Sequence, residues 1–237
     1  MQKKTIVTLT HDLRTPVSIA KISAELILRD HEKDAIGLFA KKIVANMARI
    51  DAMVDELLDA TRLRAGKNMG LEFYEMDLAK LSREICHELK IVFGDRIVFN
   101  AKGSIVGYWS EQGLRRLIEN LISNAVKYGS KNSPITVSVN QVIQGTKIEV
   151  HNKGNPIRKD DIPVLFDDYE RGADTKGQTG WGIGLGLVKA VAEAHKGKIN
   201  VESSEKHGTS FVIILPNDFR KAAFGKKAVD FHQPNQL

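Results

Sequence analysis

The stretch "THDLRTPVS", residues 10–18, lies inside a regular stripe of apolar and small residues that decides how the first part of the chain folds. A second stripe follows the polar segment "RDHEKD", residues 29–34. Intervals of three and four residues are typical of a heptad seam, so residues 1–66 predict a helical hairpin. Because one hairpin buries two such stripes poorly, we expect two copies to pair as a dimeric four-helix bundle. The stripes are Ile6, Leu9, Leu13, Pro16, Ala20, Ser23 and Ile27, and then Ile36, Ala40, Ile43, Met47, Ile50, Val54 and Leu57.

After "RAGKNMG", residues 64–70, strand-like and helix-like patterns alternate. This alternation predicts an α/β sandwich with helices over one face of a mixed sheet, and an α+β class for the whole chain. We expect domains at 1–66 and 67–217 and a loose extension at 218–237. The expected strands are 71–76, 96–100, 135–142, 146–152, 198–204 and 209–215, and the expected helices are 77–91, 110–127 with Ser110 as its cap, and 183–195.

Composition narrows the classes of function. Cys86 is the one cysteine in 237 residues, which excludes an internal disulfide and a thiolate metal cluster and favours a reducing, cytoplasmic setting. No apolar run reaches the roughly 18 residues of a membrane span, and the first residues do not form a signal peptide, so we expect no membrane contact from this segment. Much of the net charge of +6 lies after Phe219, so we expect no nucleic-acid surface.

His11 is the first residue with a chemical role to explain. Helical geometry turns it away from the seam and places Thr15 on the same face. Pro16 removes the donor for the carbonyl of Asp12 and is expected to bend the helix, at a cost of about 3 kcal/mol. Strain of this kind indicates function. An exposed neutral imidazole can act as a nucleophile, with Asp12 holding the proton of the other ring nitrogen, although a surface histidine without a role is the simpler interpretation.

Two later segments are candidates for binding a nucleotide. Gly180, Gly182, Gly184 and Gly186 alternate before a predicted helix, where backbone N–H groups can approach an anion, although a plain loop would look the same. In "ENLISNAVKY", residues 119–128, two asparagines share a helix face among apolar residues, and either a Mg²⁺ ligand or a structural amide fits that setting. The residues concerned are Asn120 and Asn124, followed by Lys127 and Tyr128 where phosphates would lie.

These segments together resemble the catalytic core of two-component sensor histidine kinases, with a phosphoacceptor domain and a GHKL-type ATP-binding domain. "HDLRTP" (11–16) is similar to the family's H-box, and the similarity in order and spacing extends over about residues 5–215. The remaining motifs are "NLISNAVKY" (120–128) for the N-box, "NKGNPI" (152–157) and "GWGIGLGL" (180–187) for the two glycine boxes, "LFDDYERG" (165–172) for the F-box, and "HGTSF" (207–211) for the final Gly-Thr element.

The resemblance implies a role for each matching residue. His11 would accept the γ-phosphoryl group of ATP, with Asp12 as general base and Thr15 supporting phosphatase activity. Asn124 would ligate Mg²⁺, and Phe166 would anchor a lid over about residues 167–181. The implied nucleotide-binding residues are Asn120, Asn124, Lys127, Tyr128, Asn152, Gly154, Phe166, Arg171, Gly180, Gly182, Gly184, Gly186, Leu187 and Thr209, with Lys127 and Arg171 on phosphate oxygens.

Two positions depart from the family pattern. Asn152 stands where the family usually has an aspartate that accepts the adenine amino proton, and Pro156 replaces a glycine. An amide oxygen accepts without charge assistance, so the sequence predicts modest ATP affinity and blunted discrimination against GTP.

Three functions remain open at this stage. The chain is expected to be an ATP-dependent histidine autokinase that passes the phosphoryl group to a response-regulator aspartate, as a homodimer and as the core of a longer sensor. A chaperone-like ATPase of the same fold leaves His11, Asp12 and Pro16 without a purpose. The hypothesis of a degenerate kinase that acts as a dimeric binding module is supported only by Asn152 and Pro156.

Overall fold

The computed structural model describes residues 2–29, 33–64, 70–166, 184–218 and 220. The chain divides into two units, one built on a helical hairpin and the other on an α/β sheet, and each is described by itself. Within the described residues, no helix combines the length and the apolar composition needed to cross a bilayer.

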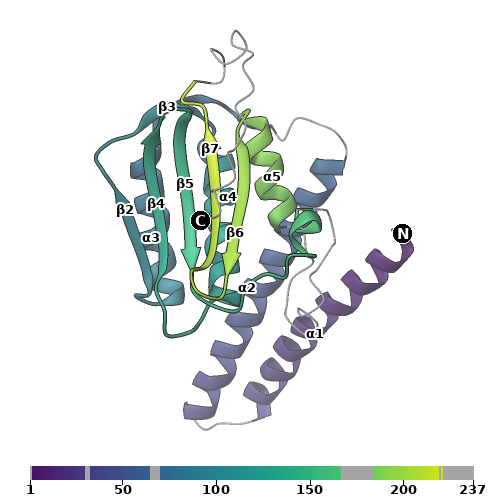
Figure 1. Cartoon of the computed structure of the whole chain (residues 1–237). Helices are drawn as coiled ribbons and strands as arrows, with labels where there is room; N and C mark the ends of the chain where they lie inside the picture. Colours follow the sequence, from purple (N-terminus) through teal and green to yellow (C-terminus); the bar gives the residue numbers. More distant parts are fainter. Residues whose placement is uncertain (1, 30–32, 65–69, 167–183, 219, 221–237) are drawn as a thin grey trace. The chain divides into compact units, whose positions relative to one another are not determined.

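The hairpin consists of α1 (Gln2–Arg29) and α2 (Lys33–Arg64), which pack along each other (Figure 1). Pro16, Ala20 and Ser23 are buried, and Leu13 and Ile27 are half-buried, which confirms the stripe predicted on α1 over these positions. Pro16 stands inside α1, and the helix continues to Arg29. Its ring therefore also serves as a small apolar contact of the seam.

Packing within one hairpin covers only part of the stripe predicted on α2, and the side chain of Leu57 lies outside the described residues. The less exposed positions are Ala35, Ile36, Phe39, Ile43, Asn46, Ile50 and Met53. Ala40, Met47 and Val54 are exposed, with 46% of Met47 and 41% of Val54 accessible. These exposed apolar positions are ones that packing against α1 leaves uncovered.

The second unit contains a five-stranded sheet in the order β2-β4-β5-β7-β6 and a separate two-stranded sheet, β1-β3. Only β2 and β4 run parallel, so the sheet is mixed, as predicted. In chain order the elements after the hairpin are β1 (Tyr74–Asp77), α3 (Leu78–Phe93), β2 (Ile97–Ala101), β3 (Val106–Trp109), α4 (Glu111–Tyr128), β4 (Ile135–Val142), β5 (Gly145–Asn152), the short 3-10 helix η1 (Ile162–Val164), α5 (Gly184–Ala194), β6 (Lys198–Ser204) and β7 (Gly208–Leu215).

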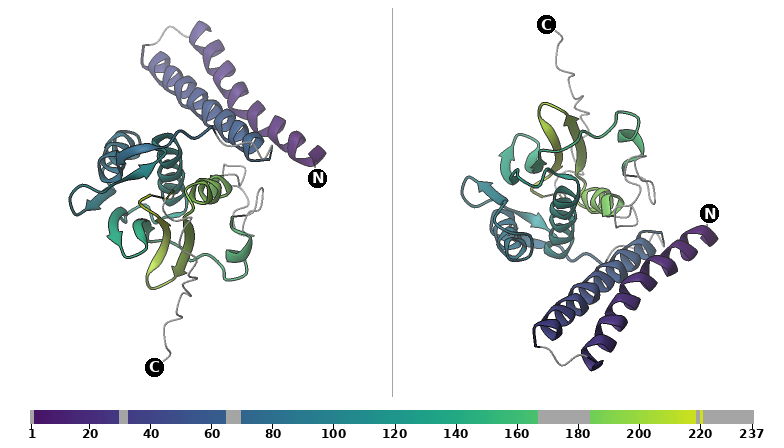
Figure 2. Two further views of the ribbon diagram at one scale, coloured as in Figure 1. Left: turned by 90° about the horizontal axis from the view of Figure 1, so that it is seen from above. Right: turned by 90° about the horizontal axis from the view of Figure 1, so that it is seen from below.

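Helices α3 and α4 cover one face of this sheet (Figures 1 and 2). Burial alternates strictly along β5, where Ile148 and Val150 point to the helices and Lys147 and Glu149 to the open face. On α4, Leu114, Leu117, Ile118, Leu121 and Ile122 are fully buried against the strands. The apolar face of α4 thereby fixes which of its residues remain available on the opposite side.

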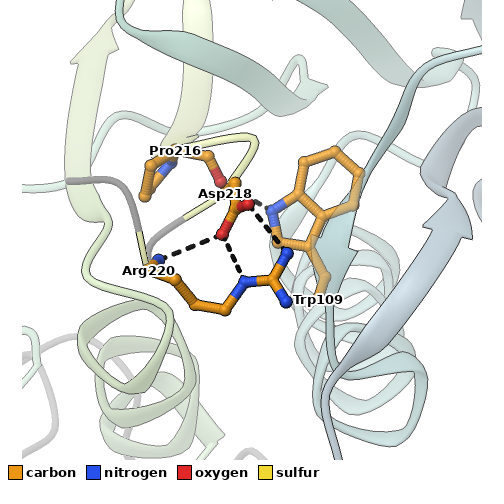
Figure 3. A network of polar contacts seen from close by, with 4 residues as sticks. All are labelled: Trp109, Pro216, Asp218 and Arg220. Atoms are coloured by element: carbon orange, nitrogen blue, oxygen red, sulfur yellow. Dashed lines mark hydrogen bonds and ion pairs between the residues drawn. The ribbon is translucent and has the colours of Figure 1, made fainter.

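The junction between β7 and the extension expected at 218–237 is held by polar contacts to β3. The indole Nε1 of Trp109 donates to the carbonyl of Pro216 over 2.9 Å, and the backbone N–H of Tyr108 donates to Asn217 over 2.7 Å. Arg220 pairs with Asp218 over 2.8 Å beside this junction (Figure 3). The chain end thus fastens β3 to the end of β7, and residues 221–237 lie outside the described part.

Candidate functional site

The backbone of α1 is helical through His11 and Asp12, whose side chains lie outside the described residues. Thr15 is exposed on α1 and Pro16 is buried next to it. Because residues four apart share a helix face, the backbone places His11 on the face of Thr15 and away from the seam.

Helix α4 carries the asparagine pair of the predicted nucleotide site. Asn120 and Asn124 are half-buried, beyond the apolar face that packs on the sheet. The amide nitrogen of Asn120 donates to the carbonyl of Arg116 over 2.9 Å, which leaves its oxygen as the atom that can act elsewhere. Lys127 and Tyr128 are exposed at the end of the helix. A polar face with one cation at its end is suited to an anionic ligand.

The two ends of α4 are held by polar contacts. Ser110 caps the start, its hydroxyl oxygen accepting from the N–H of Gly113, as predicted. At the other end the guanidinium of Arg96 donates to the carbonyls of Ser130 and Lys131 at 3.2 and 3.0 Å, and to the last carbonyls of the helix at 3.4 Å. Sequence reasoning missed Arg96, whose only signal is a basic residue opening a predicted strand.

Asn152 and Thr209 meet at one end of the sheet. They are directly opposite in the antiparallel register of β5 and β7, so their side chains lie on the same face, and both are buried. The Asn152 amide nitrogen donates to the carbonyl of Lys153 over 3.3 Å, and the Thr209 hydroxyl bonds that of Ser203 over 2.7 Å. The structure therefore brings together two residues that are 57 positions apart in sequence.

The end of α4 touches the end of β5 at a point where only glycine fits. Gly129 and Gly154 form an isolated bridge, and the N–H of Ser130 donates to Lys153 over 2.6 Å. A Cβ on Gly154 would lie 2.7 Å from the carbonyl oxygen of Tyr128, which is too close for any side chain. Gly154, predicted as a nucleotide contact, thus has a packing role that joins the asparagine helix to the Asn152 strand.

Phe166 packs its ring edge-on against Phe211 of β7, with centroids 6.5 Å apart. The loop after Asn152 is fastened nearby, because the N–H of Ile157 donates to the Ser203 hydroxyl over 2.9 Å. Phe166 is thus held against the strand that carries Thr209. Ser203, which bonds both the loop and Thr209, was missed because a serine in a strand carries no signal of its own.

The glycine-rich segment is described only in part. Gly184 begins α5, and Gly186 and Leu187 are buried in its first turn. Arg171, Gly180 and Gly182 lie outside the described residues. In the described part of the chain, no group of three or more His, Cys, Asp or Glu side chains could hold a metal ion. The amide oxygen of Asn124 suits Mg²⁺, which keeps waters and needs few protein ligands.

Comparison with known proteins matches both halves of the chain. The family described as "His Kinase A (phospho-acceptor) domain" matches residues 1–66. The family described as "Histidine kinase-, DNA gyrase B-, and HSP90-like ATPase" matches residues 110–218. The first match contains His11, Asp12 and Thr15, and the second contains α4 and all the strands from β4 to β7.

Individual proteins agree with these matches. The sensor-like histidine kinase SenX3 of Mycolicibacterium smegmatis is 28% identical over 217 residues, and the adaptive-response sensory kinase SasA of Microcystis aeruginosa is 29% identical over 221 residues. These matches cover 89% and 88% of this chain but 56% and 57% of those proteins. The chain therefore spans little more than half the length of these relatives. The structure of the Acinetobacter baumannii histidine kinase AdeS shares the fold, with a TM-score of 0.66 at 18% identity over 87% of this chain and 98% of that one.

Proposed function

From the premise that this chain belongs to the sensor histidine kinases of two-component signalling, we propose that it transfers the γ-phosphoryl group of ATP to His11 and then to an aspartate of a response regulator. The observation that carries the proposal is the presence in one chain of a phosphoacceptor hairpin and an ATPase-type sheet domain. On the hairpin, Pro16 is buried in the seam and Thr15 is exposed on the face of the backbone that also holds His11.

In the proposed reaction one ring nitrogen of neutral His11 attacks the γ-phosphorus. The N–P bond forms as the bond to the bridging oxygen of ATP breaks, and ADP leaves with that electron pair. Asp12 takes the proton from the other ring nitrogen, which leaves a neutral phosphoimidazole. Positioning and neutralisation of charge supply most of the acceleration in such transfers. Thr15, one turn away, is proposed to orient water for the reverse task of dephosphorylating the regulator.

The proposed ATP site lies on the polar face of α4 and at the ends of β5 and β7. Asn120 and Lys127 are suited to the phosphates, since one offers an amide oxygen and the other a cation. Asn124 is proposed to hold Mg²⁺, which would neutralise phosphate charge when bound. Asn152 and Thr209 are proposed for the adenine end, with Phe166 at the base of the segment that follows. Because the reaction consumes ATP, we place it in the cytoplasm.

Dimerisation is proposed through the exposed apolar faces of the hairpin. On α2, Val44, Met47 and Val54 are 68%, 46% and 41% exposed, at the intervals of one helix face. Ile22 on α1 is 54% exposed. Sedimentation of the chain should give a dimer, and Met47→Asp should shift it toward monomer. A wild-type monomer at high micromolar concentration would contradict the bundle.

Incubation with γ-labelled ATP and Mg²⁺ tests the central proposal. The chain should acquire an acid-labile, alkali-stable label. His11→Gln should abolish that label while ATP binding, measured by calorimetry, is unchanged. His87→Gln is the matched control, since His87 is an exposed histidine on α3. A label that persists in His11→Gln refutes the assignment, and ATP binding without any label in the wild type favours a degenerate kinase.

A further inference from the structure

His195 lies directly after the last residue of α5 and is fully buried, with 0% of its surface accessible. Its Nδ1 donates to the carbonyl of Val191 over 2.7 Å, and its Nε2 accepts from the backbone N–H of Ser110 over 3.0 Å. A carbonyl can only accept and an N–H can only donate, so the imidazole is neutral with its proton on Nδ1. Both ring nitrogens are therefore committed to backbone groups of two different helices.

The partners of His195 lie where three parts of the sheet unit converge. Ser110 is the residue that caps α4. The ring of Phe73 lies 4.9 Å from the imidazole, centroid to centroid, and Phe73 belongs to the first described residues after position 69. A Cβ on Gly113 would lie 3.4 Å from Cε1 of His195 and 3.1 Å from Leu71, so the entering chain packs against the first turn of α4. One imidazole thus joins the start of α4, the end of α5 and the entry of the chain.

We propose that His195 is a positioning residue for nucleotide binding, which sets α4 and α5 in register through the Ser110 and Val191 backbone groups. This inference rests on the proposed ATP site. Asn124 lies 14 residues after Ser110, or about 21 Å along a helix that rises about 1.5 Å per residue. A tilt of about 3° at the capped end moves Asn124 by about 1 Å, which is enough to matter for ligand geometry.

Protonation of His195 would replace its hydrogen bond with the Ser110 N–H by a repulsive contact. An imidazolium carries N–H groups on both nitrogens, so Nε2 would face the Ser110 N–H donor to donor. Burial lowers the pKa of His195 from 6.5, against the opposing effect of the Val191 carbonyl, and neither cause involves a charged side chain. The titratable groups of the surrounding elements are Glu72 and Tyr74 on the entering chain, Glu111 on α4, and Glu193 and Lys196 beside His195. The Tyr74 hydroxyl donates to the Glu111 carboxylate over 2.7 Å. The link is therefore intact at neutral pH and is lost as pH falls below 6.5 through the lowered value.

Two substitutions separate positioning from packing. His195→Phe keeps a ring against Phe73 but removes both hydrogen bonds, whereas His195→Gln keeps an amide oxygen that can accept from Ser110. In the full chain we expect His195→Phe to raise the ATP dissociation constant and the KM for ATP about tenfold, or about 1.4 kcal/mol. The rate at saturating ATP should change less than about twofold, because the chemistry at His11 is untouched. His195→Gln should recover most of the affinity, and His87→Gln serves as the surface control.

The same variants supply a pH profile and a folding check. Wild-type ATP affinity should weaken on acidification below about pH 6.5 more steeply than that of His195→Gln, which does not titrate. Thermal melts identify any unfolded variant, and the ¹⁵N shifts of His195 in the wild-type chain should report the Nδ1–H tautomer independently of any variant. Unchanged ATP affinity in His195→Phe, or a lower rate with unchanged KM, overturns the inference alone, as does the other tautomer. A wild-type chain that does not bind ATP overturns both it and the proposed function.

Discussion

Asn152 offers a sharp test of how the proposed pocket reads its base, and the perturbation is Asn152→Asp. The side chain is 6% exposed, and its amide nitrogen already donates to the carbonyl of Lys153 over 3.3 Å. That bond uses an N–H of the amide and leaves Oδ1 as an acceptor, which is the atom that we propose for the amino group of adenine. The carbonyl of guanine would face the same oxygen, acceptor to acceptor. The sequence alone predicted weak discrimination between ATP and GTP. With the amide placed in this way, we expect a preference for ATP over GTP of about tenfold or more, which corresponds to about 1.4 kcal/mol.

The magnitude for Asn152→Asp follows from replacing a donor with an acceptor. The new oxygen faces the Lys153 carbonyl, which keeps its own partner in the N–H of Ser130 at 2.6 Å. Bound nucleotide excludes the water that would solvate this oxygen, and a buried charged group without a partner costs about 1–3 kcal/mol or more. The charge-assisted bond to adenine returns about 1 kcal/mol over a neutral one. The net effect is about 1 kcal/mol against ATP, or about fivefold weaker binding.

Calorimetric titration of ATP and GTP on both proteins, from about pH 6 to 8, measures these terms. In the variant, a protonated carboxyl group at position 152 could donate to the Lys153 carbonyl as the amide does, so the variant should bind ATP better as pH falls. The wild type controls for the titration of ATP itself, and Asn100→Asp on the exposed edge of β2 controls for added charge. Tighter ATP binding by Asn152→Asp with the pH dependence of the wild type would refute the reasoning and identify Asn152 as a weakened aspartate.

Three further predictions concern catalysis and stability. Thr15→Ala should keep autophosphorylation of His11 and lose dephosphorylation of the regulator, so equal losses in the two assays would reject that role. Trp109→Phe should lower the free energy of unfolding by about 1–3 kcal/mol in denaturant titration, because the Pro216 carbonyl loses its buried donor. Asp77→Ala should remove the cap of α3 at a cost of about 1–2 kcal/mol. Burial raises the Asp77 pKa, but hydrogen bonds, first that from the N–H of Ile105, lower it more, so the wild-type advantage should be present above pH 3.8 and vanish as pH falls through the folded value.

The periodic parts of the fold could be read from sequence. Residues 135–142 and 198–204 were predicted as strands with the bounds that β4 and β6 have, because β-branched residues alternate there with polar ones. Ser110 predicted the start of α4, because it is a capping residue that precedes an apolar stripe. The spacing of apolar and small residues predicted that Pro16 lies in the seam of α1, where it is buried. Its small ring suits a crowded contact, although helix propensity alone argues against a proline inside a helix.

The rest depends on contacts that leave no periodic trace. Strand β3 was not predicted, because it is four residues long and includes Gly107, whose missing side chain leaves room for the indole of Trp109. The contact of Asn217 with β3 could not be predicted, because it uses backbone groups that any residue carries. Of the proposed site, the motif residues could be listed from sequence, but the direction of the Asn152 amide could not, because it depends on the carbonyl of its neighbour.

Helix α4 shows why those contacts matter for the proposed site. A helix leaves N–H groups at its start and carbonyls at its end without partners, and a polar residue nearby is often used to satisfy them. Here Ser110 meets the first need and Arg96 the second, while His195 fixes the capping residue itself. Asn120 uses only its amide nitrogen in a hydrogen bond to a carbonyl of the same helix. Because each end has its own partner, the helix that carries the proposed phosphate-binding residues is held at both ends by contacts of the protein itself.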